Sequence, residues 1–121
     1  MSAHPLVRFR DTLEGGVAVV DLLPHEITEP DQSALLGDAL RSVVDSGVSR
    51  LVLINASATR YMSSSAFAAL LKFGLHARES GGRAAVCGMD PAVKFGANII
   101  RLGEVVPIFD DEATALAALI A

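Results

Sequence analysis

Three consecutive serines, Ser63, Ser64 and Ser65, are the residues of this chain whose type and spacing most suggest chemistry. Each hydroxyl can accept a phosphoryl group, and the residues that follow, up to Leu70, have the composition of a helix start. Free backbone N–H groups and the helix macrodipole favour an anion there, so a phosphoserine would add about −1.5 to −2 charges without melting the helix. The alternative is structural, with Ser63 as the helix cap and small neighbours fitted under a loop.

The other groups capable of chemistry are scattered along the chain. His4, His25 and His76 fall in different predicted elements, and none has metal-ligand spacing with another. His25 and Glu26 adjoin in a loop, where a solvated pair is the simpler interpretation. Cys87 is the one cysteine and is expected to be an inert thiol in a buried strand. Dinucleotide, Walker and serine-hydrolase motifs are absent from the sequence, so we expect no enzyme, no cofactor and no metal site.

Strands and helices alternate along the sequence. Apolar and β-branched runs predict the strands, and helical spacing of apolar residues predicts the helices. The predicted strands are 7–10, 17–23, 50–55, 84–87 and 105–109, and the predicted helices are 31–46, 63–80, 90–102 and 110–121. This order predicts an α/β fold, a mixed sheet of about five strands, parallel in the middle, packed with about four helices. Leu35 and Leu75 are expected to face the core.

Local signals mark the ends of these elements. Asp31 is expected to cap the first long helix, and Asp90 to cap the helix that Pro91 begins. Residues 110–112 are all acidic, which suits the positive end of the last helix and explains them without a cation site. Pro107 predicts an edge position for the last strand, because proline has no N–H to donate.

The composition limits the function classes. With 121 residues, 51% of them hydrophobic, we expect a single domain, residues 1–121, with a sizeable core. The net charge of −4 disfavours nucleic acid as a partner, because phosphate binding needs a basic face. No 18-residue apolar stretch and no apolar region of signal-peptide length is present, so we expect a cytoplasmic protein that does not insert into a membrane.

From about Val17 to Ala121 the chain resembles the STAS domain, the fold of bacterial anti-sigma-factor antagonists. The resemblance rests on the strand 51–55, the segment 61–70, the turn 81–83 and the segment 105–110. At the second of these, the family pattern is aromatic, apolar, Asp, Ser, Ser or Thr, Gly, Leu, Gly. This is the most informative of the four segments, because it contains the serines.

Four residues match that pattern directly: Tyr61, Met62, Ser64 and Ser65. Phe67 keeps an apolar side chain where the family has leucine. By this alignment the resemblance implies that Ser64 is the phosphorylated residue.

The chain also departs from the family pattern. Asn55 and Ser63 stand where the family has aspartate, and Ala66 and Ala68 stand where it has glycine. Three adjacent serines leave alternatives for the phosphoryl acceptor, since Ser63 or Ser65 could serve in place of the middle one.

The resemblance implies a binding module. Unphosphorylated, such a protein docks on an anti-sigma factor of the histidine-kinase-like ATPase type and frees the sigma factor, which regulates transcription. The anti-sigma factor phosphorylates the serine with ATP, and a PP2C-type phosphatase reverses the modification. A dianion in the interface adds repulsion and desolvation cost, which breaks the complex. The protein itself is expected to be a monomer or a weak homodimer.

The docking surface implied by this fold includes the loop 57–62, the serines and the exposed face of the second helix. Arg60 and Tyr61 suit an interface, because arginine and tyrosine are enriched at binding hot spots. The alternative is that Tyr61 closes the loop on the core while Arg60 is solvated. The expected contact residues are Ser57, Arg60, Tyr61, Met62, Ser63, Ser64, Ser65 and Phe67.

Two other functions remain open at this stage. One is a constitutive adaptor, a STAS subunit of a stressosome-like assembly or of a transporter complex, in which the serine run is structural. The other is a sensor that binds a small ligand or nucleotide at the helix start near residues 63–65.

Overall fold

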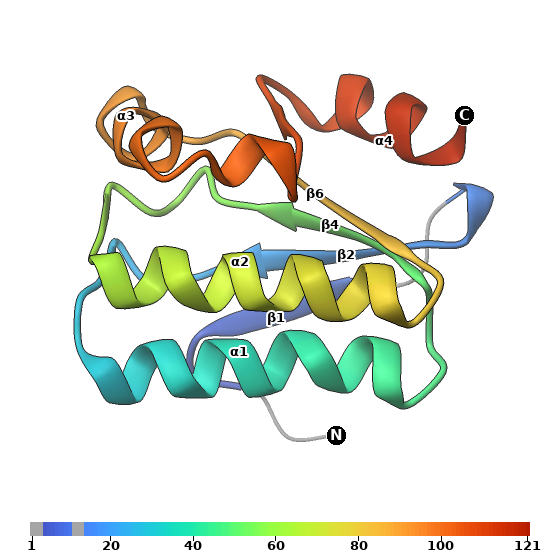
Figure 1. The fold of residues 1–121 in the computed structure, drawn as a ribbon, viewed down its shortest axis with the longest axis horizontal. Helices are drawn as coiled ribbons and strands as arrows, with labels where there is room; N and C mark the ends of the chain where they lie inside the picture. The colour runs from blue at the N-terminus through green and yellow to red at the C-terminus, as the bar shows by residue number, and fades with distance from the viewer. Residues whose placement is uncertain (1–3, 11–13) are drawn as a thin grey trace.

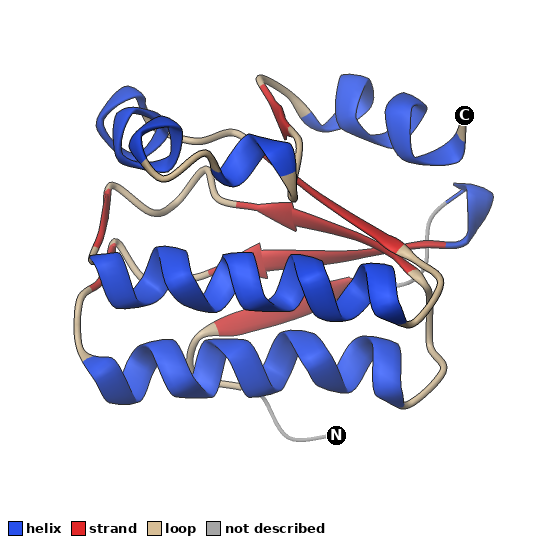
Figure 2. Ribbon diagram, in the orientation of Figure 1, coloured by secondary structure: helices blue, strands red, loops and turns tan. Residues whose placement is uncertain are grey.

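A five-stranded sheet with helices on both faces forms the framework of the computed structural model, which describes residues 4–10 and 14–121 (Figures 1 and 2). Its strands stand in the order β1-β2-β4-β6-β7, and only β1 is antiparallel to its neighbour. The predicted mixed α/β sheet with a parallel middle is confirmed. The strand bounds are β1 Val7–Arg10, β2 Val17–Leu22, β4 Leu51–Asn55, β6 Arg83–Cys87 and β7 Ile108–Phe109.

Four α-helices cover this sheet. Helices α1 and α2 lie side by side on one face, and α4 lies on the other (Figure 1). Helix α3 packs at one end, against the start of α2. The bounds are α1 Pro30–Asp45, α2 Ser64–Glu79, α3 Pro91–Ile99 and α4 Glu112–Ile120, with short 3₁₀ turns η1 Glu14–Gly16 and η2 Leu102–Glu104.

The central strands are mostly apolar, as strands covered on both faces are. Alternate residues of β2 therefore enter two different cores. Val20 points into the cluster beneath α1 and α2, whereas Val19 points into the smaller cluster beneath α4. Both are fully buried, as are Leu53 and Ile54 in the neighbouring strand β4.

Two short strands were not predicted. β3, Glu26–Ile27, and β5, Tyr61–Met62, pair in parallel and form a separate two-stranded sheet where the sequence indicated loops. The last strand is also shorter than predicted. Val105 and Val106 complete the 3₁₀ turn instead, since both backbone N–H groups donate to Leu102 O, at 3.0 and 2.8 Å. β7 keeps its predicted edge position.

The predicted helix cap at Asp31 is wrong. Helix α1 begins one residue earlier, at Pro30, with Glu29 as its N-cap. The side chain of Gln32 accepts hydrogen bonds from the backbone N–H groups of Thr28 and Glu29, both at 3.0 Å. This glutamine, three residues after the cap, is the reach-back half of a capping box, so the helix begins without a cap at Asp31.

Two leucines predicted to face the core are exposed instead. Leu35 and Leu75 are each about half as accessible as in an extended chain, at 47% and 44%. The buried stripe of α1 passes through Leu36 and Leu40, and that of α2 passes through Phe73. Each exposed leucine lies one or two residues away from that stripe, which turns it toward solvent.

No helix within residues 4–10 and 14–121 is long and apolar enough to cross a membrane.

Helices α1 and α2 each contain a buried glycine, and the two differ in the space around them. A Cβ at Gly74 would lie 2.4 Å from Val106 Cγ2 and 2.8 Å from Val105 Cγ1. At Gly37 the nearest atom would be the end of the Arg41 side chain, at 3.4 Å. The glycine in α2 is therefore required by the packing of the 105–106 segment, whereas the glycine in α1 is not.

We predict that Gly74→Ala lowers the free energy of unfolding by about 1–3 kcal/mol through overpacking, although alanine is the better helix former. Gly37→Ala is the matched control and should be neutral or stabilising by up to about 1 kcal/mol. Urea denaturation followed by circular dichroism measures both. Equal effects of the two substitutions would contradict this account.

Candidate functional site

The segment between β4 and α2 is anchored to the segment between β2 and α1. Thr59 is fully buried, and its hydroxyl donates to the carbonyl of Pro24 at 2.8 Å. At the start of the same segment, the N–H of Ala56 donates to Cys87 O on β6, at 2.9 Å. These bonds place the loop over the carboxyl ends of the parallel strands.

Backbone hydrogen bonds continue this anchoring up to the first residue of the serine run. The N–H groups of Arg60 and Tyr61 donate to His25 O at 2.7 and 3.2 Å, and the N–H of Ser63 donates to Ile27 O at 2.9 Å. The β3–β5 pairing lies between these bonds. The segment that leads into α2 is therefore held by the carbonyls of three residues of another loop, Pro24, His25 and Ile27.

Asn55 stabilises the beginning of this segment at the end of β4. Its Oδ1 accepts a hydrogen bond from the N–H of Ser57, at 3.0 Å. An aspartate carboxylate could accept the same bond, so the asparagine preserves the turn without adding a charge.

The three serines have different environments. Ser63 is the N-cap of α2, and its hydroxyl accepts from the N–H of Ala66 at 3.3 Å. The Ser65 hydroxyl lies 2.9 Å from that of Ser63 and 2.9 Å from that of Ser33 on α1. Ser64 is exposed, and among the described residues its side chain forms no hydrogen bond. The Ser64 hydroxyl can therefore react without first breaking a hydrogen bond to any of these residues.

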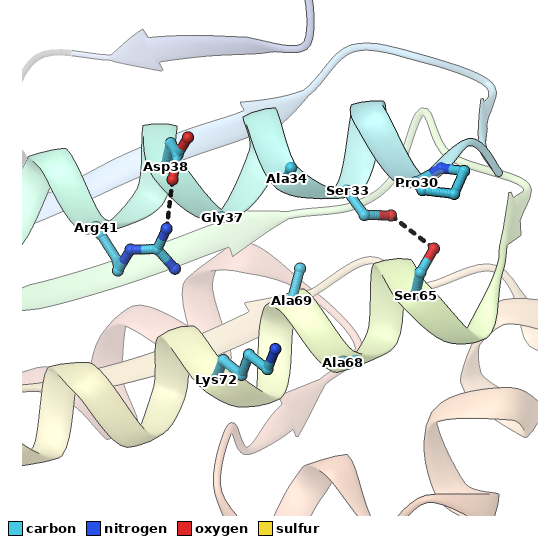
Figure 3. Close-up of a pocket in the computed structure, with 10 residues that line it drawn as sticks. All are labelled: Pro30, Ser33, Ala34, Gly37, Asp38, Arg41, Ser65, Ala68, Ala69 and Lys72. Carbon is cyan, nitrogen blue, oxygen red and sulfur yellow. Dashed lines mark hydrogen bonds and ion pairs between the residues drawn. The ribbon is translucent and has the colours of Figure 1, made fainter.

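A groove of about 370 Å³ runs between α1 and α2 beside these serines (Figure 3). Ser33 and Ser65 face each other across one end of it, and Arg41 and Lys72 lie along the rest. The residues between them are small, which lets the two helices approach closely.

A second cavity, of about 280 Å³, lies between the serine loop and α3. Its floor is formed by Met62 and Phe67, which are buried, while Arg60 and Tyr61 form its rim. Of the contact residues expected from the sequence, Ser57, Arg60, Tyr61 and Ser64 are thus exposed, and Ser63 and Ser65 are half-buried.

Sequence reasoning missed the contribution of α3. Phe95 and Ile99 are 70% and 67% exposed, four residues apart on one face of this helix, and Tyr61 nearby is 50% exposed. We call these three residues the α3 patch. The sequence did contain a signal: Val93 and Ala97, also four apart, already supply the buried face. A second apolar pair on the same short helix therefore has no place in the core.

The histidines lie apart. His76 contacts Asp45 across the α1–α2 interface at 2.6 Å, and His25 is exposed in the loop before β3. His4 accepts a hydrogen bond from the N–H of Leu6 at 3.0 Å. Within the part of the chain that the structure describes, no three histidine, cysteine or acidic side chains gather as metal ligands.

The three carboxylates before α4 have separate partners. Asp111 caps the helix, and hydrogen bonds from Thr114 lower the pKa of its carboxyl group. Asp110 pairs with Lys94 at 3.2 Å. Glu112 pairs with Arg10 of β1, and this hydrogen bond raises the pKa of the arginine.

Arg10 also belongs to a cluster at the edge of the sheet that the sequence did not reveal. The buried carboxylate of Asp21 on β2 accepts from Arg8 at 2.8 Å and from Arg10 at 2.9 Å. The cluster joins the edge strand β1 to its neighbour and, through Glu112, to the start of α4.

Comparison with known proteins gives one family. The STAS domain family model matches residues 23–115, which is most of the chain. No curated protein sequence matches the chain.

Solved structures share the fold at low sequence identity. An anti-sigma-factor antagonist STAS domain protein from Planctomyces limnophilus has a TM-score of 0.80, with 20% identity over 95% of this chain and 98% of its own. The Bacillus cell fate determinant SpoIIAA, in its phosphorylated form, has a TM-score of 0.69, with 14% identity over 93% and 97%. A sulfate transporter family protein from Wolinella succinogenes has a TM-score of 0.68, with 17% identity over 86% and 84%.

Cys87 lies in the core beneath α4, where removal from solvent raises the pKa of its thiol to about 11. The folded protein therefore holds this proton more tightly than the unfolded chain, whose thiol titrates near its ordinary value. The contribution of the protonated thiol to the free energy of unfolding is fully present below that ordinary value and is lost as pH rises toward 11.

We predict that between pH 9 and 11 the wild type loses more free energy of unfolding than Cys87→Ala, as measured by urea denaturation. A parallel decline in both proteins would refute the shift.

Proposed function

The chain belongs to the STAS domain family, and we propose that it is an anti-sigma-factor antagonist switched by phosphorylation of Ser64. It is a binding module that docks, unphosphorylated, on an anti-sigma factor of the histidine-kinase-like ATPase type and so releases a sigma factor. A PP2C-type phosphatase resets it. We expect a cytoplasmic monomer or weak dimer.

One observation carries this proposal: the only serine of the run without a described side-chain bond is also the exposed one, at the first position of α2. It lies in the segment that joins the second cavity to the helix. Support also comes from the fold shared with SpoIIAA, a protein solved in a phosphorylated form. Ser63, which stands where the family has aspartate, still caps the helix and leaves Ser64 projecting from it.

The chemistry requires only this hydroxyl from the chain. The Ser64 Oγ attacks the γ-phosphorus of ATP bound to the kinase, the bond from that phosphorus to the β-phosphate oxygen breaks, and ADP leaves. The hydroxyl proton passes to a base of the kinase. No acidic residue lies in the first turn of α2, so the new phosphate meets free N–H groups and no like charge there.

The docking surface that we propose joins Ser64 to the α3 patch. Tyr61, Phe95 and Ile99 supply apolar area, and Arg60 supplies a charged rim. Exposed aromatic and arginine side chains of this kind form binding hot spots in other interfaces. A phosphate dianion in such a surface would have to be desolvated on docking, which weakens the complex.

A constitutive adaptor is the second candidate. The likeness to a sulfate transporter family protein favours it, because the same fold occurs in a protein of that class. In this case the serine run would only start the helix. Native mass spectrometry separates the two: an assembly subunit forms large particles by itself, whereas a switch remains a monomer or dimer.

The first test is phosphorylation. The protein is incubated with Mg²⁺, ATP and each histidine-kinase-like anti-sigma factor of the source genome, and its intact mass is measured. We expect one added phosphate with one partner, mapped by peptide sequencing to Ser64. Ser64→Ala should remain unmodified, while Ser46→Ala, on the exposed serine that follows the end of α1, should behave as the wild type. A stable complex without any phosphate would support the adaptor instead.

The second test is binding to that partner, measured by isothermal titration without ATP. We predict that Ser64→Asp weakens affinity by about two orders of magnitude, a coupling of a few kcal/mol, while Ser64→Ala retains it. Ser42→Asp adds the same charge in the distal half of α1 and is the control for charge alone.

The same titration tests the α3 patch. Phe95→Ala should weaken binding about tenfold or more, whereas Val48→Ala, at a residue 61% exposed after the end of α1, should not. Equal affinities for Ser64→Asp and Ser64→Ala would refute the switch, and an unaffected Phe95→Ala would remove α3 from the interface.

A further inference from the structure

Three serine hydroxyls form a chain of hydrogen bonds between the first turns of α2 and α1. Ser63 Oγ and Ser65 Oγ are 2.9 Å apart. Ser65 Oγ and Ser33 Oγ are also 2.9 Å apart, and Figure 3 shows this second contact between the two helices. Ser33 is buried, and its hydroxyl lies 3.4 Å from the carbonyl of Glu29. The chain thus runs from Ser63, the N-cap of α2, to the carbonyl of Glu29, the N-cap of α1.

The ends determine the direction of every hydrogen bond in this chain. At one end the N–H of Ala66 can only donate, and Ser63 Oγ accepts from it at 3.3 Å. At the other end the carbonyl of Glu29 can only accept. Ser63 therefore donates to Ser65, Ser65 donates to Ser33, and Ser33 donates to Glu29 O. In this arrangement each hydroxyl gives one hydrogen bond and receives one.

Ser64 stands outside the chain, although it lies between two of its members in sequence. A phosphoryl acceptor must release its hydroxyl proton and turn its oxygen toward the incoming phosphorus. Ser63 and Ser65 would each have to break two hydrogen bonds to do so, and Ser65 would then place a phosphate against α1 in the groove. Ser64 loses none.

We propose that Ser33, on α1, is a positioning residue that restricts phosphorylation to Ser64 by holding the hydroxyl of Ser65 and, through it, that of Ser63. The inference deepens the proposed function and rests on it. Ser33 never contacts the phosphate. It acts by accepting a hydrogen bond from the hydroxyl of Ser65. Without this bond, Ser65 would be a second nucleophile, one residue from Ser64.

The experiment maps phosphate in a background without the natural acceptor. The kinase is the one that the phosphorylation test described above identifies. With this kinase and ATP, Ser64→Ala should take no phosphate. The double variant Ser33→Ala/Ser64→Ala should take phosphate on Ser65, at least tenfold more than the single variant. The matched control is Ser42→Ala/Ser64→Ala, since the hydrogen bond that the structure describes for the Ser42 hydroxyl lies within α1, to Ala39 O at 2.6 Å. It should remain unmodified.

A second measurement does not depend on the kinase. Release of Ser65 loosens the cap at Ser63, so amide hydrogen exchange at Ala66 should become at least threefold faster in Ser33→Ala than in the wild type. Ser65→Ala removes the middle hydroxyl from the other helix and should produce the same increase. Ser42→Ala should leave the rate unchanged.

The outcomes separate this inference from the function on which it rests. Phosphate on wild-type Ser64, with none on the Ser33→Ala/Ser64→Ala variant, overturns the role of Ser33 alone. Exchange at Ala66 that is unchanged in Ser33→Ala overturns it as well. A wild-type chain that takes no phosphate from any candidate kinase overturns both proposals together.

Discussion

The position of α2 depends on a short stretch of backbone hydrogen bonding between two loops. The β3–β5 pairing, with the bonds to His25 O and Ile27 O on either side of it, joins the chain before α1 to the chain before α2. Without these bonds, the loop after β4 would be held only through Ala56 and the buried Thr59, whose bonds lie before Arg60. The exposure of Ser64, the cavity beside it and the contact between the two helix starts all follow from this one constraint.

The sequence predicted the framework because the framework is local. Apolar runs, glycine turns and serine or aspartate caps act within a few residues, which is why the sheet, the four helices and the cap at Ser63 were predicted correctly. Contacts between distant segments were not predictable in this way. The β3–β5 pair has only two residues in each strand, and the Ser33–Ser65 contact joins residues 32 positions apart. Neither leaves a periodic signal. The exposure of Phe95 depends on which face of α3 the sheet leaves free.

Neutral residues supply structural hydrogen bonds at two positions where the family has aspartate. Asn55 makes the turn after β4, and Ser63 caps α2, each with an oxygen that an aspartate would also supply. Two of the chain's carboxylates have partners elsewhere, Asp21 with two arginines and Asp111 at the start of α4. No acidic residue lies in the first turn of α2, so a phosphate on Ser64 would change the electrostatic potential there strongly.

The two edges of the sheet are blocked by different means. β1 carries Arg8 and Arg10, which Asp21 and Glu112 hold in place along the strand, and β7 has only two residues and follows directly after Pro107. Charged, ion-paired side chains on one edge and a short, proline-led strand on the other make both edges poor templates for a strand from another chain. Contacts of this protein with other molecules therefore fall to its helices and loops.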